Sequence, residues 1–306
     1  MQDIYIDGLV NEITARVKQR LNGEKPSDAP CVAGQPGPEC ESCQGCHVQR
    51  ADDVRDIIQI GASRIGAGPG NVRPDSDLAG YIDHTLLKPE ASREELRLFC
   101  EEALKFGFAS VCVNASNIKY CASLLQGSNV LPIAVVGFPL GAMTPSAKGF
   151  EAREAVRNGA KEIDMVINIG GLKSKDYSLV LEDIASVVGA AQAMPVKVIL
   201  ENASLTRDEK VIGCVLSKIG GAAFVKTSTG FGVGGATTED VGLMREIVGK
   251  HMGVKASGGV RTTEDAKKMI EAGATRIGAS ASVQIVTTGA GTNKAKKSSR
   301  LVGGGY

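Results

Sequence analysis

Residues 222–259 read AAFVKTSTGFGVGGATTEDVGLMREIVGKHMGVKASGG and contain one complete unit of the pattern that decides the fold. The apolar run Ala222–Lys226 is followed by a glycine-rich loop, a helix-length segment from about Thr237, and a second apolar run, Val254–Ala256. Continuous apolar runs that alternate with helical segments indicate parallel strands covered by helices. The stretch therefore predicts a strand–helix–strand unit of a parallel sheet.

The same alternation extends from about Leu78 to Val286. Six further short runs have the length and composition of strands: Tyr81–Asp83, Ser110–Val113, Pro132–Gly137, Glu162–Asn168, Val196–Glu201 and Arg276–Gly278. Eight strands, each followed by a helix-length segment, in roughly 210 residues match the size of a (β/α)8 barrel. We therefore predict an α/β fold, a (β/α)8 TIM barrel over residues 78–286, preceded by a helical and cysteine-rich extension.

The composition excludes several classes of protein. Among 306 residues, 35 Lys and Arg stand against 34 Asp and Glu, and 43% are hydrophobic. A net charge of +1 supplies no global attraction for nucleic acid or an anionic membrane. No apolar run approaches the roughly 18 residues of a membrane span, and the N-terminus lacks the basic start and apolar block of a secretion signal. We expect a cytoplasmic protein with reduced cysteines and without nucleic-acid or membrane partners.

The segments outside the predicted barrel differ from it in composition. Residues 1–24 place apolar side chains at three- and four-residue steps, which predicts a short amphipathic helix. We expect residues 25–77 to form a cysteine-rich linker and a helix–strand extension, and residues 287–306 to form a flexible tail. Four cysteines of the linker are spaced densely enough to ligate a structural zinc ion or an iron–sulfur cluster: Cys31, Cys40, Cys43 and Cys46. The alternative is a set of reduced thiols on the surface of the linker.

Two lysines and one aspartate stand where the catalytic groups of such barrels lie. Lys226 and Lys255 end strands six and seven, and Asp164 lies in strand four, so all three point at the carboxyl-terminal mouth. A buried ammonium costs several kcal/mol unless its charge is paired or its pKa falls. A second cation one strand away favours the neutral amine, the nucleophile that forms a Schiff base with a carbonyl compound, and Asp164 could then move protons. The alternative is a set of Lys–Asp ion pairs that holds the strands together.

The turns after strands seven and eight are candidates for binding a phosphate group. Ser257–Val260 and Gly278–Ser280 are short turns before helices, and their backbone N–H groups can face an oxyanion. This is the common phosphate site of (β/α)8 barrels, although glycine also serves ordinary turns. Residues 230–235 formally match the dinucleotide-binding pattern G-x-G-x-x-G, but the next strand ends in Lys255 rather than in the acidic residue that would hold a ribose. A cofactor-dependent oxidoreductase is therefore the less favoured class of enzyme.

Several of these segments resemble, in order and in spacing, the 2-deoxyribose-5-phosphate aldolases, which are class I aldolases on a TIM barrel. The matching segments are Asp83–Pro89, Val136–Gly141, Glu162–Asn168, Phe224–Phe231, Gly235–Thr237 and Val254–Thr262. The resemblance implies reversible cleavage of 2-deoxy-D-ribose 5-phosphate to acetaldehyde and D-glyceraldehyde 3-phosphate, with no cofactor for catalysis. It implies that Lys226 forms the Schiff base, that Lys255 lowers the pKa of Lys226, and that Asp164 relays protons.

The same resemblance implies the substrate-binding residues. Four residues match positions that line the pocket of the family: Asp83, Thr85, Cys112 and Thr229. Four others match its phosphate cradle: Gly230, Gly258, Gly259 and Ser280. We also expect a homo-oligomer, and Tyr306 resembles a terminal tyrosine that covers the site in some members. Two other functions stay open: another Schiff-base lyase acting on a sugar phosphate, and a non-catalytic barrel that binds a shell or partner protein.

The N-terminal segment resembles an element of a different kind. An amphipathic helix followed by a Pro/Gly-rich linker is similar to the encapsulation peptides that dock cargo enzymes on the shells of bacterial microcompartments. The resemblance implies a shell-protein partner for residues 1–24 and a location within a microcompartment. The alternative is a helix that packs on the chain's own barrel or on a sister subunit.

Overall fold

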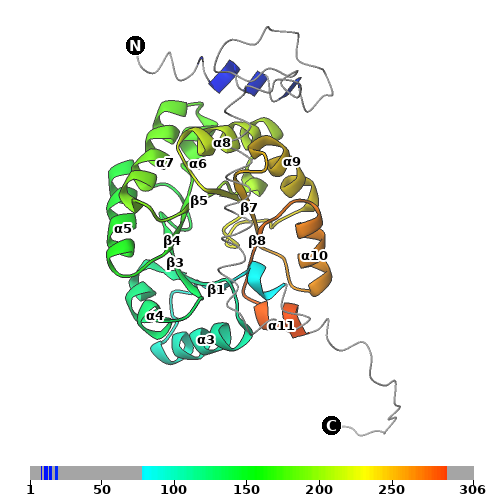
Figure 1. Cartoon of the computed structure of the whole chain (residues 1–306). Helices are drawn as coiled ribbons and strands as arrows, with labels where there is room; N and C mark the ends of the chain where they lie inside the picture. The colour runs from blue at the N-terminus through cyan, green and yellow to red at the C-terminus, as the bar shows by residue number, and fades with distance from the viewer. Residues whose placement is uncertain (1–7, 9, 13, 16–17, 20–77, 288–306) are drawn as a thin grey trace, which may run out of the picture.

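A computed structural model describes residues 8, 10–12, 14–15, 18–19 and 78–287. Residues 78–287 form a closed barrel of parallel strands with helices around it (Figure 1). The strands follow one another around the barrel in chain order: β1 (Ile82–Leu86), β2 (Ser110–Asn114), β3 (Leu131–Val136), β4 (Glu162–Val166), β5 (Val196–Ile199), β6 (Phe224–Lys226), β7 (Gly253–Ser257) and β8 (Arg276–Ala279). This confirms the predicted (β/α)8 fold.

The helices form the outer layer in Figure 1 and cover the outward faces of the strands. The α-helices are α3 (Arg93–Phe106), α4 (Ile118–Leu124), α5 (Pro145–Arg157), α6 (Ile169–Lys173), α7 (Tyr177–Ala191), α8 (Arg207–Ile219), α9 (Thr238–Val248), α10 (Thr263–Glu271) and α11 (Ser282–Thr287). Short 3-10 turns occur at η2 (Ala79–Tyr81), η3 (Ala115–Asn117) and η4 (Asn202–Ser204).

Local sequence signals set where several helices begin. Ser92, Thr206 and Thr262 are N-caps whose side chains accept a hydrogen bond from the backbone N–H three residues on, and the acidic residue there bonds back to the N–H of the cap. Asn168 caps α6 by accepting a 2.9 Å hydrogen bond from the N–H of Gly171. Because Asn168 is used as a cap, β4 ends two residues earlier than the sequence pattern predicts.

The interior of the barrel is divided into an apolar part and a charged part. A small buried cluster contains Leu87, Cys112, Ile133 and Val135, with Phe138 packed on it. Six charged residues with at most 4% of their surface exposed occupy other positions on the strands: Asp83, Glu162, Asp164, Lys197, Lys226 and Lys255. The larger apolar core lies between the strands and the surrounding helices.

The described residues of the N-terminal segment are helical and lie beside α8 (Figure 1). Val10 has no exposed surface, and Lys18 Nζ lies 2.7 Å from Asp208 Oδ2 on α8. The predicted cysteine site (Cys31, Cys40, Cys43 and Cys46) and the tail that ends in Tyr306 lie outside the described residues. Within the described ranges, no helix combines the length and the apolar character needed to cross a membrane.

Candidate active site

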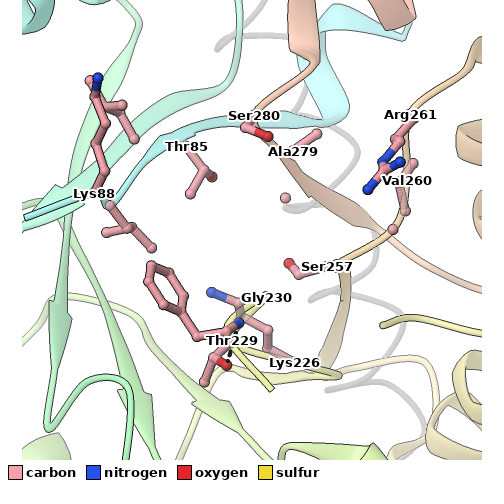
Figure 2. A pocket seen from close by; sticks show the side chains of 16 residues that line it. Thr85, Lys88, Lys226, Thr229, Gly230, Ser257, Val260, Arg261, Ala279 and Ser280 are labelled. Atoms are coloured by element: carbon pink, nitrogen blue, oxygen red, sulfur yellow. Dashed lines mark hydrogen bonds between the residues drawn. The ribbon is translucent and has the colours of Figure 1, made fainter. Parts of the chain in front are cut away.

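A cavity of about 410 Å3 opens at the carboxyl ends of β1, β6, β7 and β8. In Figure 2, Lys226, Thr229 and Gly230 lie on one side of the open space, and Thr85 and Ser280 lie on the opposite side. The cavity therefore stands at the end of the barrel where the strand-terminal residues converge, as expected for an enzyme of this fold.

The cavity reaches Lys226, which shares a carboxylate with a second lysine. Lys226 Nζ lies 2.9 Å from Asp164 Oδ2, and Lys255 Nζ lies 2.8 Å from the same oxygen. The register of β6 and β7 places Lys226 opposite Lys255. Lys226 is 2% exposed, and the other two side chains are completely buried. The structure thus brings together the three residues that the sequence singles out.

The surroundings favour the neutral amine of Lys226 and the charged forms of its neighbours. Burial lowers the pKa of Lys226, and Lys255 lowers it further, against the opposing attraction of Asp164. Burial also disfavours the charged form of Lys255, but Asp164 and Asp83 outweigh it and raise the pKa of Lys255. Asp164 is buried as well, yet three neighbouring lysines hold its pKa well below the usual value. An amine and a carboxylate are therefore available side by side.

Lys197 is a third lysine at Asp164 that the sequence analysis missed. It lies on β5 without exposed surface, and its Nζ is 2.9 Å from Asp164 Oδ1. It also forms an ion pair with Glu162 on β4. The signal was present in the sequence, because Lys197 interrupts the apolar run Val196–Ile199 in the same way that Lys226 ends its own strand.

Six of the eight predicted substrate-binding residues line the cavity: Thr85, Thr229, Gly230, Gly258, Gly259 and Ser280. The other two, Asp83 and Cys112, are fully buried and, in the described structure, stand apart from its lining. Asp83 lies two residues before Thr85 on β1 and pairs with Lys255 at 2.6 Å. Burial raises the pKa of Cys112 to about 11, which keeps it a neutral thiol. The structure thus places these two residues outside the cavity lining, and their contact with the substrate stays a prediction.

The glycine-rich loop after β6 approaches the predicted phosphate turn after β7 through backbone atoms. Gly258 and Gly259 have φ values of 84° and 80°, which favour glycine. The N–H of Ala236 donates to the carbonyl of Gly258 at 2.9 Å, and a Cβ on Gly235 would lie 2.4 Å from that same oxygen. The glycines of residues 230–235 therefore permit a close approach of two loops rather than forming a dinucleotide site.

The sequence analysis missed two further residues, one that lines the cavity and one that holds a lining residue in place. Arg261 lies at the rim beside Val260 (Figure 2), and its guanidinium has no carboxylate partner within the described part of the chain. Glu201 holds the opposite loop, because it accepts a 3.1 Å hydrogen bond from the N–H of Thr229 and a second one from the hydroxyl of Thr229. A cation is thus available next to the turns that could bind an anion.

Comparison with known proteins assigns this geometry to a family. A sequence model described as DeoC/LacD family aldolase matches residues 78–293. The chain belongs to this aldolase family. The deoxyribose-phosphate aldolase of Macrococcus caseolyticus is 59% identical over 210 residues, which make up 69% of this chain and 96% of that protein. The deoxyribose-phosphate aldolase of Clostridium perfringens is 58% identical over 209 residues, with 68% of this chain and 93% of that protein covered.

A solved structure of the same kind agrees with the aldolase barrel described above. The tetrameric structure of deoxyribose phosphate aldolase from Aeropyrum pernix matches with a TM-score of 0.67 at 32% identity, over 78% of this chain and 98% of that chain. The matched family segment begins after the cysteine cluster, so Cys31 to Cys46 lie outside the aldolase region. Within the described residues, no group of three or more His, Cys, Asp and Glu side chains is arranged to hold a metal ion.

Proposed function

We propose that this protein is a deoxyribose-phosphate aldolase that works through a Schiff base on Lys226. The reaction is the reversible cleavage of 2-deoxy-D-ribose 5-phosphate to acetaldehyde and D-glyceraldehyde 3-phosphate. The observation that carries the proposal is a buried lysine that faces a cavity and shares its carboxylate with a second lysine. Membership of the aldolase family and the names of the similar proteins support the same reaction.

The contacts of the three lysines around Asp164 favour Lys226 as the nucleophile. Lys197 and Lys255 each pair with a second carboxylate in addition to Asp164. Among the described residues, Lys226 pairs with Asp164 alone, and it is the lysine of the three that lines the cavity. The buried amine with the fewest carboxylate partners is the one whose pKa is least raised, so it is the most easily kept neutral and therefore nucleophilic.

In the proposed cleavage, the neutral Nζ of Lys226 attacks C1 of the open-chain sugar. The resulting carbinolamine loses water and becomes a protonated Schiff base. Loss of the C3 hydroxyl proton then breaks the C2–C3 bond, and its electron pair moves toward the Schiff-base nitrogen to give an enamine. D-Glyceraldehyde 3-phosphate leaves, the enamine takes a proton at C2, and water releases acetaldehyde and regenerates Lys226.

Asp164 and Lys255 are placed to serve the proton transfers of this sequence. The Asp164 carboxylate lies within hydrogen-bond distance of both amino groups and can accept the proton that the attacking amine sheds. Lys255 keeps its own proton because two carboxylates contact it, so it stabilises the ionised Asp164 and disfavours an ammonium at Lys226.

The phosphate of the sugar would bind at the far side of the cavity from Lys226. The Arg261 guanidinium supplies the positive charge there, and the turns at Gly258, Gly259 and Ser280 supply backbone N–H donors. A phosphate held at that rim directs the aldehyde end of the sugar toward the amine. This arrangement suits a phosphorylated sugar better than a neutral one.

Borohydride reduction in the presence of acetaldehyde tests the proposal. The purified full-length protein should gain an ethyl group on Lys226, identified by peptide mass spectrometry, and should release D-glyceraldehyde 3-phosphate from 2-deoxyribose 5-phosphate in a coupled assay. Lys226→Arg should abolish both results, whereas Lys267→Met, at an exposed lysine of α10, should change neither. Ethylation at a different lysine, or cleavage that survives in Lys226→Arg, would overturn the assignment.

The extension and the quaternary state carry separate predictions. We propose that residues 1–24 dock the enzyme on a microcompartment shell in the cytoplasm. The alternative is that this segment packs on the chain's own barrel, and the contact of Lys18 with Asp208 on α8 supports that alternative. A fluorescent protein fused to residues 1–24 should form discrete foci at the shells in cells that assemble them. A diffuse signal would favour packing of the segment on the barrel. Metal analysis of the full-length protein tests for zinc or iron at the four cysteines, and light scattering tests for a homo-oligomer.

A further inference from the structure

Lys226 stands next to a network of ion pairs that extends beyond the groups used in the proposed reaction. The network contains six side chains, of which the most accessible, that of Arg276, is 14% exposed: Asp83, Glu162, Asp164, Lys197, Lys255 and Arg276. Arg276 joins its two ends, because its guanidinium lies 2.7 Å from Asp83 Oδ1 and 3.1 Å from Glu162 Oε1. A change of charge on one member therefore alters the electrostatic energy of the members paired with it.

The six groups are three acids and three bases, so their charges cancel while Lys226 is neutral. A proton on Lys226 would add a fourth positive charge to three negative ones in a region that is almost closed to solvent. An unbalanced charge in such a region is unfavourable. Despite burial, the neighbouring carboxylates raise the pKa of Lys197 and Arg276, which keeps these two bases charged. The charge balance of the network therefore favours the neutral form of Lys226.

Lys197 acts on Lys226 through the Asp164 carboxylate. It takes Oδ1 of Asp164, while Lys226 and Lys255 share Oδ2. The positive charge of Lys197 offsets part of the negative charge of Asp164, so Asp164 stabilises an ammonium at Lys226 less strongly. The Glu162 carboxylate in turn offsets the charge of Lys197. Lys197 is absent from the cavity lining in the described structure, so its influence on the reaction is electrostatic.

We propose that Lys197 and Glu162 are positioning residues that set the pH range in which Lys226 acts as a nucleophile. Lys197 favours the neutral amine, and Glu162 opposes it. The inference rests on the proposed Schiff-base role of Lys226. It goes beyond that role because it assigns a function in the reaction to an ion pair that the substrate does not touch.

Among the described residues, the other elements around Lys226 add no group that we expect to titrate near neutral pH. β3 contributes the apolar Ile133 and Val135 to the barrel interior, and β2 contributes Cys112, whose pKa burial raises to about 11. The remaining charged groups on the strands and on the loop after β5 already have partners: Asp83, Lys255, Arg276 and Glu201. Substitution of Lys197 or Glu162 therefore changes the charge next to Asp164.

The test is the pH midpoint for borohydride trapping of the acetaldehyde adduct on Lys226, measured on full-length variants. Lys197→Met removes a positive charge and should move the midpoint to higher pH by about one unit. Glu162→Gln removes a negative charge and should move it to lower pH by about one unit. The double variant keeps the charges balanced and should return the midpoint close to that of the wild type.

A matched control separates electrostatics from structural damage. Lys148 and Asp183 form another buried ion pair, 2.6 Å long, between α5 and α7, and Lys148→Met should lower stability while leaving the trapping midpoint unchanged. Midpoints of Lys197→Met and Glu162→Gln that stay at the wild-type value, or that move in the same direction, would overturn the inference. So would a double variant that remains shifted. Absence of any adduct on Lys226 in the wild type would instead overturn the proposed function.

Discussion

Replacing Lys255 with methionine should raise the pH at which Lys226 becomes reactive by about two units. The two amino groups lie within 2.9 Å of the same Asp164 oxygen, so they are less than about 6 Å apart. At an effective dielectric constant of about 20, two unit charges at that distance repel each other by about 2.8 kcal/mol, which corresponds to about two pH units. Asp83 loses one cationic partner in the variant, and its freed negative charge acts in the same direction.

The assay is the rate of adduct formation with acetaldehyde, followed by borohydride trapping between about pH 6 and about pH 11. The rate follows the fraction of neutral Lys226, so a shift of two units slows Lys255→Met by about 100-fold at neutral pH and leaves it close to the wild type at the alkaline end. Lys267→Met, at an exposed lysine, serves as the control for loss of one positive charge. Equal slowing at every pH would refute the electrostatic role of Lys255 and would indicate a role in positioning or proton transfer instead.

Three further predictions concern stability and substrate choice. Lys148→Met or Asp183→Leu alone should lower the free energy of unfolding in urea by about 3–5 kcal/mol, because each leaves its buried partner unpaired, whereas the double variant should recover most of the loss; additive losses would contradict this. Arg261→Met should raise KM for 2-deoxyribose 5-phosphate by about 10- to 100-fold and leave cleavage of unphosphorylated 2-deoxyribose unchanged in steady-state kinetics; equal losses on both sugars would exclude a phosphate contact. Burial lowers the pKa of His84 from 6.5 to about 3, so the unfolded chain binds a proton first and the folded protein loses stability as the pH is lowered across that window. His84→Leu should therefore lose less stability than the wild type when the pH is lowered from 6.5 to about 4, as measured in denaturant titrations. Parallel losses in the two proteins would refute this prediction.

The sequence predicts the fold well because its signals are local. An apolar strand such as Val196–Ile199 and a helix cap such as Thr206 can be identified from a few neighbouring residues. Strand ends are less predictable, since Asn168 could extend β4 and instead caps α6. The same local reasoning selects Lys226 and Lys255, because an amine at the end of an apolar strand is conspicuous.

The sequence alone therefore determined the eight-stranded barrel and named three reactive groups at its mouth. Only the tertiary structure decided which lysine is left with the least negative charge. Lys255 lies 91 positions from Asp164, and Arg276 lies 193 positions from Asp83, yet closure of the barrel brings each pair into contact. The protonation of a buried amine depends on distances of a few ångströms to every neighbouring charge. No pattern along the chain contains those distances, which is why the contacts of Lys197 with Asp164 and Glu162 are known only once the strands have closed.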